Sequence, residues 1–356
     1  MSTRIAIIPL PTRIEERSGS VTLTPDAVIA WQGTGAEDAA QLLAEYLRPA
    51  TGFALPVSTL SAAPTAALQC VATGTARPDD AGFVNEAYTI DSANAVVRLE
   101  AENGTGLARA VQTLRQLLPA AVFSATRQNA DWTIPAVRIA DEPRFRWRGL
   151  HMDVCRHFFS VAEVKRFIDL LALHRLNTLH LHLTEDQGWR VEIKRYPKLT
   201  TIGAKRPCSL IGHESARPRR YDNVPHSGFF TAADIREIVA FAAQRHVTIV
   251  PEIDMPGHMQ AAIAAYPELG NTGAALEPRC HWGISHSILN AEESTVRFMC
   301  NVLDEIMELF PSRFIHIGGD EAPKLEWAES RRAQDLMIER GLTDEHELQS
   351  WFIRQL

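Results

Sequence analysis

Apolar and polar residues alternate along four short stretches in the second half of the chain. These stretches are residues 149–154, 178–184, 248–254 and 314–321. A period of two is typical of β-strands whose two faces meet different surroundings. The segments between them repeat apolar residues at helical spacing, at 162–174, 231–246 and 293–309. Strands that alternate with helical crossovers predict a parallel α/β sheet.

The faces of these four predicted strands favour a sheet closed into a barrel wrapped by helices. Each strand has one apolar face, such as Leu179, Leu181 and Leu183 in the second strand. The opposite faces carry histidines and acids, namely His151, Asp153, His180, His182, Glu252, Asp254 and His316. Barrel interiors are usually filled with Val, Ile and Leu, and buried ionisable groups are costly unless paired. We therefore expect either a self-satisfied polar network or one that supports a functional site.

Residues 1–142 predict a separate α+β domain, followed by the barrel domain at 143–356. Strand-like runs and two helical patterns alternate there, at 28–31, 36–50, 68–72, 88–100 and 106–118. The segment from Asp141 to Pro143 marks the boundary, because proline interrupts regular structure and the two acids favour solvent. No constellation of titratable residues occurs before it, so we expect a supporting or partner-binding role for the first domain.

Composition narrows the function classes. The hydrophobic content of 46% suits a large core, and the net charge of −7 argues against nucleic acid as a partner. No stretch reaches transmembrane length, and the composition also allows a homo-oligomer. The N-terminal residues lack the pattern of a signal peptide, so we expect the cytoplasm, or the periplasm or secretion if the N-terminus was trimmed. The five cysteines show no metal spacing, which predicts free thiols and no metal or other cofactor.

The stretch at 314–321 holds the strongest candidate chemistry. Gly318 and Gly319 allow a sharp turn and a close approach, and the adjacent carboxylates of Asp320 and Glu321 follow directly. In a barrel, active sites lie at this C-terminal end of the strands. The alternative is ordinary helix capping by an acidic residue.

Four motifs in succession resemble the β-N-acetylhexosaminidases of glycoside hydrolase family 20. They are Trp-Arg-Gly-Leu-His-Met-Asp-Val-Cys-Arg-His-Phe-Phe at 147–159, Leu-His-Leu-Thr-Glu-Asp-Gln-Gly-Trp-Arg at 181–190, Pro-Glu-Ile-Asp-Met-Pro-Gly-His at 251–258 and His-Ile-Gly-Gly-Asp-Glu at 316–321. The resemblance covers residues 143–356, while the first domain only loosely resembles the family's accessory domain.

This resemblance implies a role for each motif residue. Glu321 would be the general acid/base, and Asp320 would hold and polarise the 2-acetamido group of the substrate. Arg156 would bind hydroxyls of the terminal sugar. Asp186 and His258 would form a hydrogen-bonded network that tunes the acid. The implied substrates are glycans with terminal N-acetylhexosamine, such as chitooligosaccharides, in carbohydrate metabolism.

The adjacency of the two acids fits a substrate-assisted reaction. Most glycosidases place two carboxylates about 5 Å or more apart across the scissile bond, whereas neighbouring Cα atoms are only about 3.8 Å apart. If the acetamide oxygen attacks C1, no enzyme nucleophile is needed. One carboxylate then protonates the leaving oxygen, and the other balances the charge on the acetamide. The configuration is retained.

The resemblance implies a (β/α)8 TIM-type barrel as the catalytic domain. The chain supplies only about four of its eight β/α units, so we expect a fragment or a half-barrel completed by another chain. Two alternatives follow. One is a sugar-binding remnant without turnover. The other is a metal-dependent, amidohydrolase-like barrel, because His180 and His182 place two imidazoles on one strand face.

Overall fold

The computed structural model describes residues 5–79 and 82–356. Residues 80–81 and residues 1–4, the first part of the N-terminal stretch considered as a signal peptide, lie outside the described part. The chain divides into two compact units. The first comprises residues 1–149 with 167–178 and 242–247. The second comprises residues 150–166, 179–241 and 248–356.

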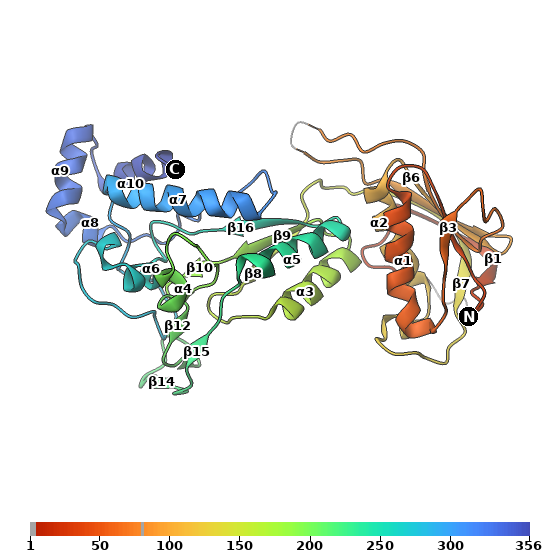
Figure 1. Cartoon of the computed structure of the whole chain (residues 1–356), viewed down its shortest axis with the longest axis horizontal. Helices are drawn as coiled ribbons and strands as arrows, with labels where there is room; N and C mark the ends of the chain where they lie inside the picture. The colour runs from red at the N-terminus through yellow and green to blue at the C-terminus, as the bar shows by residue number, and fades with distance from the viewer. Residues whose placement is uncertain (1–4, 80–81) are drawn as a thin grey trace. The chain divides into compact units, whose positions relative to one another are not determined.

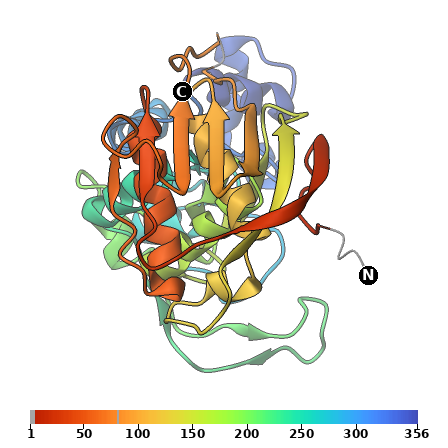
Figure 2. The same cartoon turned by 90° about the vertical axis from the view of Figure 1, so that its right-hand side faces the viewer.

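The first unit is built on a seven-stranded mixed sheet in the order β1-β7-β5-β6-β4-β2-β3. The strands are β1 (Arg13–Thr22), β2 (Ile29–Gln32), β3 (Val57–Thr59), β4 (Leu68–Ala72), β5 (Tyr88–Ala93), β6 (Val96–Ala101) and β7 (Thr133–Asp141). β5 and β6 form an antiparallel hairpin, while β2, β3, β4 and β6 pair in parallel. Figure 2 shows this sheet facing the viewer, with its helices behind it.

Two amphipathic helices cover one face of this sheet. They are α1 (Ala36–Thr51) and α2 (Gly104–Leu117), and a short 3-10 turn follows at Ala120–Phe123. Asn103 caps α2, because its side chain accepts hydrogen bonds from the first turn. Gly52 ends α1 in the left-handed conformation. The apolar faces of both helices and the sheet share one hydrophobic core.

From β8 onward, strands and helices alternate along the chain (Figure 1). The main elements are β8 (Gly149–Asp153), α3 (Val161–Leu173), β9 (Thr178–His182), α5 (Ala232–Gln244), β16 (Thr248–Glu252) and α7 (Glu293–Leu309). The three long strands form a sheet in the order β16-β9-β8. The next segment continues it through a parallel bridge between Glu252 and His316. Spatial order therefore follows sequence order, as it does in a β/α barrel.

Short elements fill the connections of this region. They are β10 (Thr184–Glu185), β11 (Gly188–Trp189), α4 (Lys198–Thr201), β12 (Lys205–Arg206), β13 (Leu210–Ile211), β14 (Arg220–Tyr221), β15 (His226–Ser227), α6 (Gln260–Ala265) and a 3-10 turn at Pro267–Leu269. Three helices close the described chain, namely α8 (Leu325–Glu329), α9 (Arg331–Arg340) and α10 (Glu345–Arg354).

Most predicted elements are present, with two kinds of difference. The predicted fourth strand at 314–321 is reduced to the single bridge at His316, because the chain turns away at Gly318. Strands β1, β3 and β7 were not predicted. β1 is largely exposed and polar, so its sequence shows little period-two hydrophobicity.

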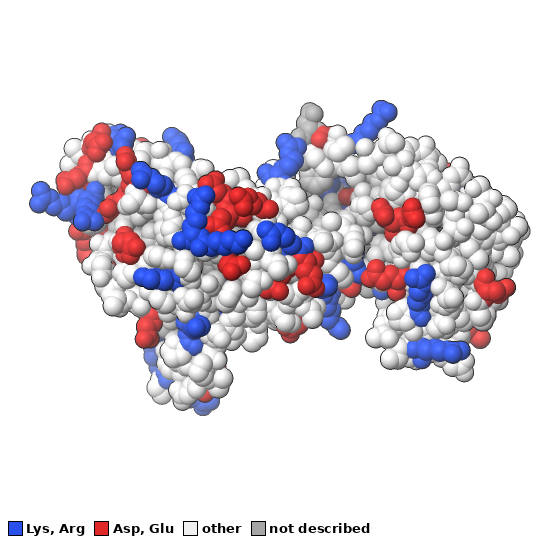
Figure 3. All heavy atoms as spheres, in the orientation of Figure 1, with Lys and Arg blue, Asp and Glu red and all other residues white. Residues whose placement is uncertain are grey.

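In the described part of the chain, no helix is long and apolar enough to cross a membrane. All five cysteines are free thiols. Basic and acidic side chains lie interspersed on the face shown in Figure 3.

Candidate active site

Three of the four residues in the turn at 318–321 have a positive φ. The φ angle is +61° at Gly318 and +99° at Gly319, and Glu321 also has a positive φ of +46°. A Cβ atom on Gly318 would lie 1.7 Å from Oδ1 of Asp254, so only glycine fits there. Positive φ in residues other than glycine is concentrated at functional sites, which points to Glu321.

Asp254 and Gln349 both form hydrogen bonds with Gly319 in this turn. The backbone N–H of Gly319 donates to Oδ1 of Asp254, at 2.9 Å, just beyond the end of β16. The side chain of Gln349 on α10 donates to the carbonyl oxygen of Gly319, at 2.7 Å. Asp254 is almost fully buried, and burial raises its pKa to about 7 despite the hydrogen bond from Gly319. The turn is therefore fixed at both backbone polar groups of Gly319.

The two predicted acids project outward from this turn. The Asp320 and Glu321 side chains are 68% and 51% exposed. A hollow of about 390 Å³ lies beside Glu321. Its lining residues are Ile284, Gly319, Glu321, Ala322, Pro323, Lys324, His346 and Gln349. The structure thus presents both carboxylates to open space, where a ligand can reach them.

His258 connects these carboxylates to the interior. Its Nδ1 atom lies 2.7 Å from Oε1 of Glu185. Its Nε2 atom lies 3.4 Å from Oε2 of Glu321 and 3.8 Å from Oδ2 of Asp320. Burial opposes the charged imidazole, but the Glu185 hydrogen bond and nearby acids raise the pKa of His258 to about 9. His258 is therefore a cation that faces the acidic pair at neutral pH.

Glu185 is the buried anion at the centre of this arrangement. Its Oε2 atom lies 3.1 Å from the Arg156 guanidinium and 3.1 Å from Nε2 of His182. Burial alone would raise the pKa of Glu185, but its histidine and arginine partners lower it to about 2. Arg156 also bonds Oδ2 of Asp153, at 3.1 Å. Because 37% of the Arg156 side chain is exposed, the guanidinium remains reachable from solvent.

Asp186 lies beside His258 but does not make the hydrogen bond expected of it. The resemblance implies a network shared by Asp186 and His258, but Glu185 makes the hydrogen bond to that imidazole. Asp186 is fully buried, and its Oδ1 accepts the backbone N–H of Gln260. Its Oδ2 lies 3.5 Å from Arg279. Burial and the charge of Glu185 raise the pKa of Asp186 to about 6. Asp186 therefore ties two loops together and acts on His258 through its nearby charge, without a direct hydrogen bond.

The inward histidines gather around one carboxylate, Glu252. Its oxygens lie 2.6 Å from His180, 2.6 Å from His182 and 2.9 Å from His316. His180, Glu252 and His316 place one ligand-type atom each within 4.8 Å of one another, a spacing that a metal ion could use. In this arrangement, however, the Glu252 carboxylate contacts all three imidazoles directly. The cluster therefore fits an ion-pair network better than the metal-dependent alternative.

Sequence reasoning missed three residues of this site, Glu185, Asp254 as a backbone acceptor, and Gln349. Strand parity places Asp254 on the inner face but does not show what it bonds. Glu185 ends the two-residue strand β10, which is too short for parity to decide which of two adjacent acids points inward. Gln349 lies on α10, about 30 residues after the turn, and no sequence signal connects the two.

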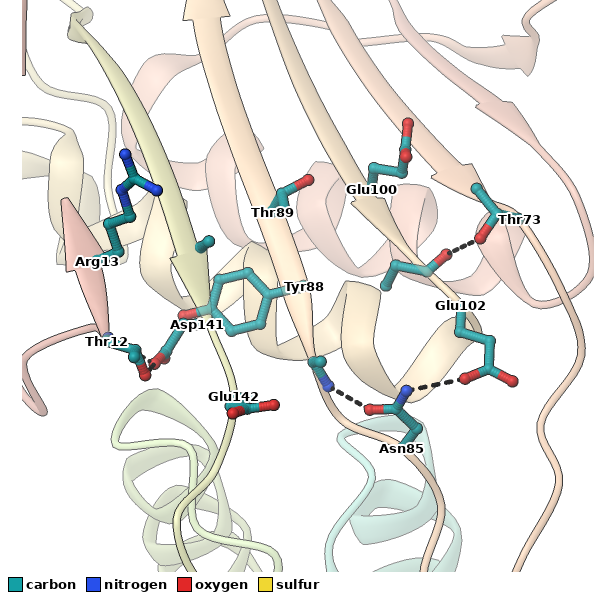
Figure 4. A pocket seen from close by; sticks show the side chains of 13 residues that line it. Thr12, Arg13, Thr73, Asn85, Tyr88, Thr89, Glu100, Glu102, Asp141 and Glu142 are labelled. Atoms are coloured by element: carbon teal, nitrogen blue, oxygen red, sulfur yellow. Dashed lines mark hydrogen bonds between the residues drawn. The ribbon is translucent and has the colours of Figure 1, made fainter. Parts of the chain in front are cut away.

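A second pocket lies in the first unit and lacks such an arrangement (Figure 4). Its volume is about 480 Å³, and its polar lining includes Thr12, Asn85, Tyr88, Glu102 and Asp141. Several of these groups bond one another. Asp141 accepts from Thr12 and Tyr88, and Glu102 accepts from Asn85. The pocket shows no adjacent acids beside a histidine, so we place the functional site at the 318–321 turn.

Comparison with known proteins identifies the class. Residues 145–356 match the family model of the glycosyl hydrolase family 20 catalytic domain, and residues 4–142 match domain 2 of the same family. The chain belongs to glycosyl hydrolase family 20. A TIM-barrel catalytic domain preceded by an N-terminal domain follows from this membership.

Individual relatives agree with this assignment. The chain is 39% identical over 352 residues to a beta-hexosaminidase of Porphyromonas gingivalis, covering 99% of this chain and 43% of the relative. It is 38% identical over 366 residues to a beta-hexosaminidase of Vibrio furnissii, covering 98% and 54%. The Streptomyces plicatus N-acetyl-beta-hexosaminidase in complex with Thio-NAglucal superposes with a TM-score of 0.77 at 37% identity, covering 94% and 64%. The chain spans about half the length of these curated relatives.

Proposed function

We propose that this chain carries the acid pair of a β-N-acetylhexosaminidase, a glycoside hydrolase that removes terminal, non-reducing β-linked N-acetylhexosamine. The observation that carries the proposal is the turn on which Asp320 and Glu321 are adjacent. His258 lies within 4 Å of both carboxylates. The names of the relatives, which include a chitobiase of Vibrio harveyi, support the same substrate class.

The geometry supports a substrate-assisted reaction with retention. Both acids start from one turn, so they cannot flank a sugar ring as a nucleophile and an acid do in other glycosidases. The acetamide oxygen of the substrate attacks C1 and forms a cyclic oxazolinium ion. Glu321 gives its proton to the leaving oxygen and then takes a proton from water. Asp320 accepts the acetamide N–H and balances the positive charge that develops there.

Other residues position these two acids and the sugar. Arg156 binds sugar hydroxyls with its exposed guanidinium edge, while Glu185 and Asp153 fix its opposite edge. His258 donates from Nε2 toward Glu321 and so favours the ionised carboxylate after the proton has left. Glu185 holds the other nitrogen of that imidazole. Asp186 fixes the loop at Gln260 and adds another acid beside Glu185 and His258, so it belongs to the same network.

We further infer that residues 143–356 supply the first four β/α units of the barrel and that residues 1–142 form the accessory domain. The strand order β8, β9, β16 and then the His316 segment supports this reading. The relatives are about twice as long. In this proposal, the remaining strands complete the walls of the sugar pocket.

The test compares two aryl glycosides that differ only at C2. A form of the protein with the whole barrel should cleave an aryl β-N-acetylglucosaminide and largely ignore the matching β-glucoside. Proton NMR of the first product should show the β-anomer, because the mechanism retains configuration. Residues 1–356 are assayed beside the longer form, and we expect the shorter chain to be much slower.

Two results would contradict the proposal. One is equal cleavage of the glucoside, which has no acetamide to act as nucleophile. The other is a covalent sugar ester on Asp320, trapped with a fluorosugar and located by peptide mass spectrometry. Binding of N-acetylglucosamine without any turnover by the longer form would favour a sugar-binding protein.

A further inference from the structure

The buried carboxylate of Glu252 gathers imidazoles from three neighbouring segments. His180 and His182 come from β9, and His316 comes from the segment after α7; each has a ring nitrogen within 2.9 Å of a Glu252 oxygen. His151 on β8 lies farther away, at 3.9 Å. Among these described histidines, His182 extends the contact toward the acid pair, because its second ring nitrogen reaches Glu185.

His182 links two carboxylates with its two nitrogens. Nδ1 lies 2.6 Å from Glu252 and Nε2 lies 3.1 Å from Glu185. A neutral imidazole has one N–H, whereas the charged form donates from both nitrogens. Donation to both carboxylates therefore requires a protonated His182. Glu185 in turn bonds Nδ1 of His258, and Nε2 of the same imidazole faces Glu321.

We propose that Glu252 is a positioning residue for the acid–base chemistry, acting on Glu321 through His182, Glu185 and His258. The proposal rests on the proposed function. The negative charge of Glu252 acts together with that of Glu185 to keep His182 protonated. The protonated imidazole fixes one oxygen of Glu185, which leaves the other oxygen directed at His258. In this way the buried residues Glu252, His182 and Glu185 set the orientation of the His258 ring beside the acid pair and keep that ring protonated.

The surroundings of His182 strengthen the dependence on Glu252. Burial disfavours its charge, but hydrogen bonds to Glu185 and Glu252 raise the pKa of His182 to about 10. Arg156 lies 3.5 Å from Nε2, and His151 also faces the ring. The positive charge of Arg156 by itself disfavours the charged form of His182. Removing the Glu252 charge takes away one of the two carboxylates that hydrogen-bond to His182. Glu185 remains, and Asp153 and Asp254 also place carboxylate oxygens within 4.8 Å of a ring nitrogen. The pKa of His182 should therefore fall in E252Q below its wild-type value.

Other charged groups lie near Glu185 and His258, the two residues that connect His182 to the acid pair. Arg156 and Asp186 face Glu185, while Asp254 and Asp186 face His258. Arg156 stays beside Glu185 when Glu252 is changed, so Glu185 remains ionised. The expected change is thus confined to His182 and to what His182 holds in place.

The experiment uses E252Q, which keeps the size of the side chain and removes its charge, in the form with the whole barrel. Imidazole ¹⁵N shifts from labelled histidine report the charge of His182, with H182Q assigning the signal. Wild-type His182 should stay charged beyond pH 9, whereas in E252Q it should titrate at a clearly lower pH than in the wild type. The kcat of E252Q should fall by about tenfold over the same pH range with KM little changed, because Glu252 lies away from the pocket. E252D keeps the charge and should largely restore the wild-type profile.

E86Q is the matched control. Glu86 is also a buried, ion-paired carboxylate, bonded to Arg109 at 2.6 Å within the first unit. E86Q should lose stability and leave the pH profile of kcat unchanged. A neutral wild-type His182 at pH 8 would overturn the proposal even if E252Q does not fold, as would an E252Q profile parallel to that of the wild type. If the wild type cleaves no N-acetylhexosaminide, the proposed function fails, while the His182 titration still decides whether Glu252 controls its charge.

Discussion

Asp254 accepts a hydrogen bond from the backbone N–H of Gly319, at 2.9 Å, and so ties the end of β16 to the turn that carries both acids. The same Oδ1 atom occupies the space where a side chain at Gly318 would begin. One carboxylate oxygen therefore fixes the path of the turn and requires glycine within it. Two predictions follow from this contact.

Gly318→Ala should unfold or displace the turn. The added Cβ would lie 1.7 Å from Asp254, and φ is +61°. We expect a loss of about 3 kcal/mol or more in the free energy of unfolding, measured by urea denaturation, together with loss of turnover. Gly341→Ala is the control, because Gly341 has φ of +65° and nothing within 4 Å of its Cβ position. That variant should lose only about 1 kcal/mol. Equal losses of stability in the two variants would show that the positive φ, and not the contact with Asp254, causes the loss in Gly318→Ala.

Asp254→Asn should stabilise the protein at alkaline pH. The pKa of Asp254 is raised to about 7, so the folded state binds its proton more tightly than the unfolded state does. Its contribution is then most favourable below the unfolded pKa near 4 and is lost as the pH rises through about 7. Asparagine has no charge to bury and keeps an oxygen for Gly319. We expect a gain of about 2 kcal/mol at pH 8 that vanishes by about pH 4. A gain that stays constant over this range would contradict the titration of Asp254.

Glu321→Gln should slow substrates whose leaving group needs a proton far more than substrates whose leaving group does not. Turnover of a substrate with a poor leaving group should fall by about 10²-fold or more, because the amide cannot supply a proton. Aryl substrates with strongly acidic leaving groups should lose much less. Glu329→Gln removes an exposed carboxylate from α8 and should leave both rates unchanged. Equal losses on both substrates in the Glu321 variant would exclude it as the general acid.

Residues that lie on regular strands are predictable from the sequence, because alternation fixes which way each side chain points. The period of two alone therefore assigns His180, His182 and Glu252 to the inner face. The acid pair is also recognisable, since Gly318 and Gly319 before two acids form an unusual local pattern. The structure places all of these residues in one unit.

The remaining contacts depend on loops and on the packing of distant segments. Glu185 ends the two-residue strand β10 and Asp186 begins the turn that follows, so no periodicity decides which of the two bonds His258. Gln349 reaches Gly319 only because α10 folds back onto the turn. A bridge at His316 replaces the predicted full strand because Gly318 redirects the chain. These features arise from tertiary contacts, which local sequence does not encode.

Asp320→Asn should weaken the preference for 2-acetamido substrates. In the proposed reaction, the Asp320 carboxylate balances the positive charge on the acetamide, which a neutral amide cannot do. Turnover of an aryl β-N-acetylglucosaminide should fall by about 10²–10³-fold, while the slow background rate on the matching glucoside should change little. A cyclic thiazoline that mimics the oxazoline should bind the wild type much more tightly than substrate, as ligands that resemble the transition state do. The same compound should lose most of that advantage in the variant. Unchanged thiazoline affinity in Asp320→Asn, measured by competitive inhibition, would show that this carboxylate does not bear on the acetamide.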